Sequence, residues 1–224
     1  MELIVVGSNS SGNCYVLANN AEALIIECGM PFSEAKKALN YNVTKVDGVL
    51  VSHEHGDHAK YLAQYERLYK VFAPALGKGS DKAVFGRFKI WSFSLNHDDV
   101  PCFGFLIEHP DMGRMVFVTD TQYVKWNFKK LNINHIICEC NYQEEKFIVA
   151  SEKAAHVITG HMSERCAREF VEANVTESLR TVIFAHLSDE NADWQEVLSN
   201  MQKASDGRYR AYVAYRGLRI EVGN

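Results

Sequence analysis

Three histidines and an aspartate lie within six residues of this 224-residue chain, in the segment His53-Glu54-His55-Gly56-Asp57-His58. Neutral imidazole is the commonest metal-binding side chain at physiological pH, and a carboxylate is a good hard ligand beside it. The segment follows an apolar run, residues 47–52, that is typical of a short buried strand. We expect Gly56 to permit a tight turn that a side chain would hinder. A strand that ends in such a turn can direct several side chains at one point, which favours a metal site over a solvated turn.

The order HxHxDH resembles the signature of the metallo-β-lactamase fold superfamily. The resemblance implies that His53 and His55 bind one metal ion, and that Asp57 and His58 bind a second. It identifies a fold and a metal centre, and it leaves the substrate open. The implied cofactors are two divalent metal ions. Zn²⁺ is the ion that a histidine-rich site favours, and Mn²⁺ is the alternative that carboxylates admit.

Three further residues follow later strand-like runs, in the order that the resemblance requires. His97 would complete the first ion's ligands, and His186 those of the second. Asp120 would bridge the two ions, because its two oxygens can span cations about 3.5–4 Å apart. Without the resemblance, His97 is a loop histidine and Asp120 is a candidate helix N-cap.

His161 is a further histidine, in addition to the seven predicted metal ligands. It resembles a histidine of nucleases of this fold, such as RNase Z, that contacts the scissile phosphate or protonates the leaving oxygen. Cleavage of a P–O bond creates an alkoxide that needs a proton, and histidine titrates near neutral pH. We therefore assign catalytic roles to His161 and to Asp57, which would orient the attacking water while binding metal. A capping or surface histidine before the helix at Ser163 is the alternative for His161.

Strands and helices alternate along the chain, which by itself predicts only an α/β protein. The resemblance implies more: an αββα sandwich of two mixed sheets with helices outside, formed by one hydrolase domain over residues 1–224. Besides residues 47–52, the expected strands are Leu3–Gly7, Cys14–Ala18, Ala23–Glu27, Val71–Ala73, Phe88–Phe93, Phe103–Glu108, Met115–Thr119, Ile136–Cys140, Thr181–Phe184 and Tyr212–Tyr215. The expected helices are Phe32–Leu39, Tyr61–Leu68, Ser163–Ala173 and Asp189–Ala204.

Composition is that of an ordinary globular protein, with 47% hydrophobic and 23% charged residues. No signal peptide and no membrane-spanning apolar stretch are visible, and the six irregularly spaced cysteines fit reduced core residues, so we expect a cytoplasmic protein. Cys138 and Cys140 could bind metal, but core packing is the better interpretation. The net charge of −4 gives no general attraction to nucleic acid, so that partner requires a local basic patch. The candidate basic residues are Lys125, Lys129, Lys130, Arg208, Arg210 and Arg216.

Similarity outside the metal motif points to one group of the superfamily, the single-domain YycJ/WalJ-type nucleases. It is carried by residues 7–14, 25–33, 160–163 and 185–191. Glu27 stands where that family commonly has an aspartate that orients the metal-binding histidines, and Glu139 and Asn141 are further polar candidates.

We therefore expect a two-metal phosphodiesterase, a DNA exonuclease, with nucleic acid as its partner and DNA preferred over RNA. The alternatives are a metal-dependent hydrolase of a small ester, lactone, thioester or cyclic phosphodiester, and a non-catalytic metal-binding module.

Overall fold

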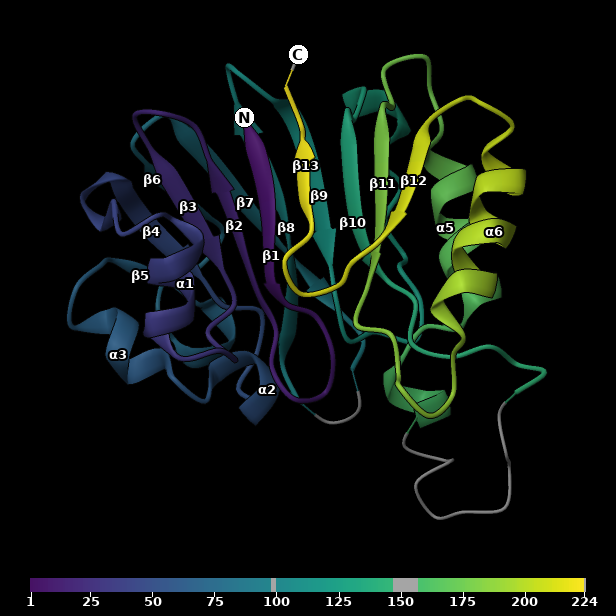
Figure 1. The fold of residues 1–224 in the computed structure, drawn as a ribbon, viewed down its shortest axis with the longest axis horizontal. Coiled ribbons are helices and arrows are strands. Elements are labelled where there is room, and N and C mark those ends of the chain that lie inside the picture. Colours follow the sequence, from purple (N-terminus) through teal and green to yellow (C-terminus); the bar gives the residue numbers. More distant parts are fainter. Residues whose placement is uncertain (98–99, 147–156, 224) are drawn as a thin grey trace.

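Two β-sheets pack face to face in the computed structural model, which describes residues 1–97, 100–146 and 157–223 (Figure 1). The first sheet has the strand order β13-β1-β2-β3-β4-β5. Its pairs are antiparallel from β13 to β3 and parallel from β3 to β5. The strands are β1 (Glu2–Gly7), β2 (Cys14–Ala18), β3 (Ala23–Ile26), β4 (Val46–Leu50), β5 (Val71–Phe72) and β13 (Arg219–Glu221).

The second sheet has the order β12-β11-β10-β9-β8-β7-β6. It is antiparallel from β6 to β9 and parallel from β9 to β12, so both sheets are mixed. Its strands are β6 (Lys82–Phe85), β7 (Phe88–Leu95), β8 (Cys102–His109), β9 (Gly113–Val118), β10 (His135–Glu139), β11 (Thr181–Ala185) and β12 (Arg210–Val213).

Helices cover the outer faces of both sheets (Figure 1). Three apolar cores result: one between the sheets, one under α1 (Phe32–Ala38) and α3 (Leu62–Glu66), and one under α5 (Glu164–Asn174) and α6 (Trp194–Ser205). Alternate residues of one strand enter different cores; Leu3 and Val5 face the other sheet, whereas Ile4 and Val6 pack on the helix side. This arrangement confirms the predicted αββα sandwich. The helices are α1 (Phe32–Ala38), α2 (Gly56–Ala59), α3 (Leu62–Glu66), α5 (Glu164–Asn174) and α6 (Trp194–Ser205), with 3₁₀ turns at Val43–Lys45, Pro74–Leu76 and Lys129–Leu131.

Some predicted boundaries are wrong, and each has a local reason. The last helix begins at Trp194 rather than Asp189, because Asp193 is its N-cap and accepts hydrogen bonds from two backbone amides of the first turn. Strand β12 is Arg210–Val213 rather than Tyr212–Tyr215, because pairing with β11 ends there and the chain then crosses to the other sheet. The pattern does not reveal β6 and β13, which are short edge strands with exposed polar positions.

The cysteines behave as core residues. All six are free thiols, and Cys138 and Cys140 are buried in the core under α5 and α6, which confirms the packing interpretation. Among the described residues, no helix is long and apolar enough to cross a membrane.

The strand directions bring several chain segments to one edge of the sandwich. Strands β9, β10 and β11 are parallel, and β7 runs the same way because two antiparallel steps separate it from β9. The residues that follow the carboxyl ends of these strands therefore emerge at a common edge. The HxHxDH segment follows β4 of the facing sheet and joins them there.

Gly29 allows the HxHxDH segment to pack tightly against its neighbours. A Cβ atom at this position would lie only 1.7 Å from the carbonyl oxygen of Asp57. The same contact is held by short backbone hydrogen bonds, from Asn13 N to Asp57 O (2.7 Å) and from Cys28 N to His58 O (2.7 Å). Gly56 by contrast begins α2 with open space around it, so the predicted need for glycine there is wrong.

Replacing Gly29 with alanine is therefore expected to lower the free energy of unfolding by ~3 kcal/mol or more, because backbone cannot move aside as a side chain can. Urea denaturation followed by circular dichroism measures this loss. Gly56→Ala is the matched control and should change stability by less than ~1 kcal/mol. Equal effects of the two substitutions would contradict the packing argument.

His135, which lies away from the edge that carries the candidate metal ligands, is expected to make the free energy of unfolding depend on pH. Burial lowers the pKa of His135 to about 4, and its Nε2 lies 3.2 Å from the carbonyl oxygen of Met112. The unfolded chain takes up a proton near pH 6.5 and the folded chain only near pH 4, so stability is present above pH 6.5 and is lost as the pH falls through this window. The loss approaches ~3 kcal/mol for one histidine. In metal-free protein, unfolding free energies between pH 7 and pH 4 should fall less steeply for His135→Gln than for the wild type, and parallel profiles would refute this assignment.

Candidate metal centre

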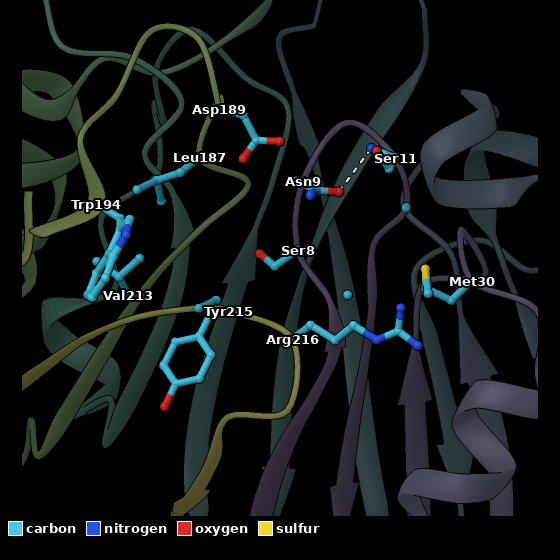
Figure 2. Close-up of a pocket in the computed structure, with 13 residues that line it drawn as sticks. Ser8, Asn9, Ser11, Met30, Leu187, Asp189, Trp194, Val213, Tyr215 and Arg216 are labelled. Atoms are coloured by element: carbon cyan, nitrogen blue, oxygen red, sulfur yellow. Dashed lines mark hydrogen bonds between the residues drawn. The ribbon is translucent and has the colours of Figure 1, made fainter.

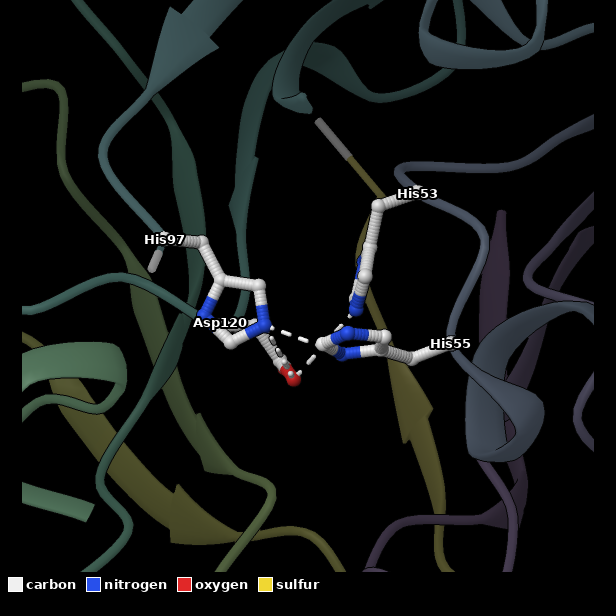
Figure 3. Close-up of side chains that lie close together, drawn as sticks. All are labelled: His53, His55, His97 and Asp120. Atoms are coloured by element: carbon white, nitrogen blue, oxygen red, sulfur yellow. Dashed lines mark hydrogen bonds and ion pairs between the residues drawn. The ribbon is translucent and has the colours of Figure 1, made fainter. Parts of the chain in front are cut away.

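The seven residues predicted to bind metal lie together at the common edge of the two sheets. They form two groups that share Asp120, with the candidate ligand atoms of each group within 4.8 Å of one another. The first group is His53, His55, His97 and Asp120 (Figure 3), and the second is Asp57, His58, Asp120 and His186.

In the first group the imidazole nitrogens converge on one carboxylate oxygen, Asp120 Oδ2. His53 Nε2 lies 3.6 Å from this atom and His97 Nε2 lies 3.8 Å from it (Figure 3). The Nδ1 atom of His55 is 3.1 Å from His97 Nε2. Two nitrogens bound to one tetrahedral zinc ion are separated by ~3.3 Å, given Zn–N distances of about 2.0–2.1 Å. The spacing thus suits a shared cation.

The second group converges on the other oxygen of Asp120 and on Asp57. His58 Nε2 is 3.2 Å from Asp120 Oδ1 and 3.2 Å from Asp57 Oδ2. His186 Nε2 is also 3.2 Å from Asp57 Oδ2, and His186 Nδ1 is 2.9 Å from Asp120 Oδ1. Each oxygen of Asp120 therefore faces a different set of imidazoles, which is the arrangement that a bridging carboxylate needs.

The donor atoms fit divalent cations. His53 Nε2 and His186 Nε2 are buried without a hydrogen-bond partner, and burying such atoms is costly unless something takes their lone pairs. Burial lowers the pKa of His53 to about 2, so its ring is neutral and can donate a lone pair. Burial raises the pKa of Asp57 and Asp120, but the neighbouring histidines hold both well below the usual range. The cluster is thus compatible with a dinuclear metal site of nitrogen and carboxylate ligands.

Hydrogen bonds to residues around the cluster fix the orientation of the candidate ligands. His97 Nδ1 donates to the carbonyl oxygen of Gly160 (2.8 Å), which leaves Nε2 directed at the cluster. His53 Nδ1 is 2.9 Å from Ser52 Oγ. Glu27 lies 3.5 Å from His58 Nδ1 and accepts a hydrogen bond from the Ser52 amide, so the longer acid reaches the place expected for an aspartate.

Three residues of the site have left-handed backbone conformations that glycine would adopt more easily. The φ angles are 70° for Glu27, 46° for Asp120 and 55° for His186. Each lies just after the end of a strand: Glu27 after β3, Asp120 after β9 and His186 after β11. Such conformations typically cost ~1–3 kcal/mol per residue and accumulate at functional sites. No glycine marks these turns in the sequence, so the pattern could not reveal them.

Glu139, considered only as a polar candidate from the sequence, is a central residue of the site. It ends β10, is fully buried, and its Oε1 accepts hydrogen bonds from His161 Nδ1 (2.6 Å) and His186 Nδ1 (3.0 Å). Its Oε2 accepts from the backbone amides of Thr121 (3.0 Å) and Met162 (3.2 Å). Burial raises its pKa, but the charge of His161 outweighs burial and holds that pKa below the ordinary value. In the sequence, the feature that could have identified Glu139 as a site residue is its position at the end of an otherwise apolar strand.

His161 lies at the cluster rather than on the surface. Its ring centre is 5.5 Å from that of His97 and 5.4 Å from that of His186, and its side chain is 12% exposed. Burial lowers its pKa, but the carboxylate of Glu139 reverses that effect and raises it above the usual value. Ser163 is the N-cap of α5, with Oγ accepting from the Cys166 amide, so the capping alternative for His161 is wrong.

The predicted basic residues do not form one patch. Arg208 is paired with Glu172. Arg210 is the first residue of β12, and the turn with Lys129 and Lys130 precedes β10. All three therefore lie away from the edge that carries the cluster, which follows the carboxyl ends of the strands. Lys125 stacks on Trp126. Arg216 lines a cavity together with Ser8 and Leu187 (Figure 2).

Comparison with known proteins agrees with this geometry. Residues 7–71 match the sequence profile of the Metallo-beta-lactamase superfamily. Exodeoxyribonuclease YycJ of Bacillus anthracis is 25% identical over 219 residues, which are 84% of this chain and 82% of that protein. The fold matches the metallo-beta-lactamase fold protein YhfI of Bacillus subtilis (TM-score 0.71, 17% identity, 98% of both chains). It also matches the short form of human tRNase Z (TM-score 0.68, 15% identity, 100% of both chains). The expected resemblance and the class of metal-dependent hydrolase are confirmed.

Metal content tests the shared carboxylate. We expect purified protein to hold two Zn²⁺ per chain, because the seven predicted ligands form two donor groups around Asp120. His97→Ala should retain one ion, whereas Asp120→Ala should lose both, because its carboxylate faces both groups. Elemental analysis after dialysis measures the ratio, with circular dichroism to check folding and His135→Gln as a control histidine outside the site. An Asp120→Ala protein that still holds two ions would contradict the bridging arrangement.

Proposed function

We propose that this protein of the metallo-β-lactamase fold is a two-metal phosphodiesterase, a DNA exonuclease formed by a single hydrolase domain. The observation that carries the proposal is the pair of His161 and Glu139 beside the cluster, with 2.6 Å between His161 Nδ1 and Glu139 Oε1. Small esters and lactones release groups that need less assistance, whereas a departing nucleoside alkoxide requires a proton. A held, protonated imidazole at this place suits the second reaction.

Seven residues would hold the cations: His53, His55, His97 and Asp120 for one, and Asp57, His58, Asp120 and His186 for the other. When bound, the two ions, for which Zn²⁺ is our first choice and Mn²⁺ the alternative, supply positive charge for the phosphate and lower the pKa of water.

The chain itself supplies positioning and the proton. Glu139 holds His161 through Nδ1 and keeps its pKa raised, so that Nε2 carries a proton for the leaving oxygen. Asp57 stays ionised and its Oδ2 accepts a hydrogen bond from the Asn13 amide (3.2 Å), which directs it to orient the attacking water. Asn141 donates to the carbonyl oxygen of His186 (3.0 Å) and fixes the strained turn that presents this residue.

The relatives support a nucleic-acid substrate. The similar bacterial proteins are named as exodeoxyribonucleases, whereas tRNase Z, which shares only the fold, is named for an RNA. DNA is therefore the substrate that we propose. A hydrolase of a small ester or thioester is the competing function that the experiment must separate.

End-labelled single- and double-stranded DNA and RNA, incubated with Zn²⁺ or Mn²⁺, provide the test. We expect progressive shortening of DNA, and a loss of at least ~100-fold for His161→Ala because general acid catalysis contributes about 10²–10⁴-fold. His161→Ala should keep its bound metal, whereas His58→Ala should lose metal and activity together. Turnover of lactones or thioesters with all nucleic acids intact would overturn the proposal.

A further inference from the structure

The glycine- and serine-rich segment 7–14 is similar to the YycJ/WalJ group, yet of its residues only Asn13 enters the chemistry described above. The segment forms the turn between β1 and β2, and both Ser8 (Figure 2) and Asn13 are buried in it. Ser8 contacts the loop that follows β11 of the second sheet, and Asn13 contacts the HxHxDH segment that follows β4 of the first. The turn therefore touches both sides of the candidate metal centre.

A chain of hydrogen bonds runs through this segment from His186 to Asp57. The backbone amide of His186 donates to Ser8 Oγ (3.0 Å), and Ser8 Oγ lies 2.9 Å from Tyr15 Oη. The Tyr15 hydroxyl donates to Asn13 Oδ1 (3.4 Å), and Asn13 Nδ2 donates to Asp57 Oδ2 (3.2 Å). Because Tyr15 donates to Asn13, the Ser8 hydroxyl donates to Tyr15, and all the bonds point the same way. In such a chain each hydrogen bond polarises and strengthens the next.

The side-chain amide of Asn13 links this chain to the metal ligands. The backbone of Asn13 is held on both sides, since its N–H donates to Asp57 O (2.7 Å) and its carbonyl oxygen accepts from Gly29 N (3.0 Å). An amide side chain can present either its oxygen or its NH₂ group to a neighbour, and the surrounding donors and acceptors decide which. Tyr15 donates to Oδ1, so the NH₂ group faces Asp57 and lies 3.0 Å from His58 Nε2. The opposite orientation would set an oxygen against the Asp57 carboxylate.

Burial prevents Asn13 and Tyr15 from acting on a substrate directly. Asn13 is fully buried, and Tyr15 is only 1% exposed. The Tyr15 ring lies in the core between the sheets, where its centre is 5.6 Å from that of Phe117 on β9. Any effect of the Tyr15 hydroxyl on catalysis must therefore pass through Asn13 and the metal ligands that Asn13 contacts.

We propose that Tyr15 is a positioning residue for the second cation, because its hydroxyl turns the Asn13 amide toward Asp57 and links that amide to His186. The inference rests on the proposed function for the assignment of these two ligands to one cation. Asp57 follows a strand of the first sheet and His186 follows a strand of the second, so the hydrogen-bonded chain sets the position of one relative to the other. Breaking the chain should weaken the second ion and spare the first.

Zinc affinity tests this role without nucleic acid. Competition with a chromophoric chelator measures the binding of each Zn²⁺ ion to the whole chain. We expect Tyr15→Phe to weaken one ion by about tenfold and to leave the other unchanged, because loss of a hydrogen-bond partner of a ligand costs roughly 10–100-fold in metal affinity. The same loss should appear in a His97→Ala background, which is expected to keep only the second ion. If the loss is absent from that background, the effect belongs to the first ion and the proposal is overturned.

Tyr65→Phe is the matched control. Tyr65 is also fully buried and its hydroxyl donates to the carbonyl oxygen of Met30 (2.8 Å), but it lies in the core under α1 and α3. This variant should lower the urea midpoint about as much as Tyr15→Phe and keep both zinc affinities. Equal zinc affinities in the two variants would overturn the proposal.

Ser8→Ala breaks the same chain one bond away and provides the test if Tyr15→Phe does not fold. We expect it to weaken the same ion about tenfold. The double variant should bind zinc no more weakly than either single variant, because both changes remove one shared chain. Losses that multiply would show two separate effects and contradict the proposal.

Kinetics separates this role from the proposed function. With Zn²⁺ saturating, kcat on DNA should fall about tenfold in Tyr15→Phe with KM unchanged, because the buried hydroxyl touches no substrate. A raised KM with unchanged kcat would overturn the positioning role and leave the nuclease intact. A protein that cleaves no nucleic acid but shows the expected zinc affinities would overturn the nuclease and support the role of Tyr15.

Discussion

The rest of the site is arranged around the buried carboxylate of Asp120, which is shared by two groups of histidines. Its carboxylate is almost fully buried, yet each oxygen faces a different set of imidazoles and Thr119 Oγ1 donates to Oδ1 at 2.6 Å. A buried carboxylate is costly unless it is paired or coordinated. The histidines around it are held so that several ring nitrogens have no hydrogen bond of their own. Cations between these donors would satisfy both needs at once, so the edge of the sandwich is compatible with a dinuclear metal site.

Packing outside the site stabilises this edge of the sandwich. Left-handed turns at Glu27, Asp120 and His186 are unfavourable locally. They persist because the cores on both faces of each sheet fix the strands on which they stand. Close backbone packing at Gly29 holds the HxHxDH segment against the first sheet in the same way. Stability of the scaffold thus maintains a strained arrangement of ligands.

The proposed acid–base chemistry depends on loops that also carry candidate metal ligands. Glu139 joins His161 to His186, so the proposed proton donor is positioned by a residue that also contacts the cluster. The loop after His186 continues directly into the wall of the cavity that Arg216 lines. A change in that loop would alter the presentation of His186.

The HxHxDH motif, most strands and the candidate ligands at the ends of later strands could be predicted from the sequence, because they depend on local apolar runs and on residue types at fixed spacing. It also indicated His161 and, more weakly, Glu139. It did not determine that α6 begins at Trp194, that Gly29 rather than Gly56 is the sterically required glycine, or that the basic residues are dispersed. Those points became visible only in the folded chain, as did the position of Asp120 between two groups of histidines. Each depends on contacts between segments distant in the chain, whose packing no local pattern encodes.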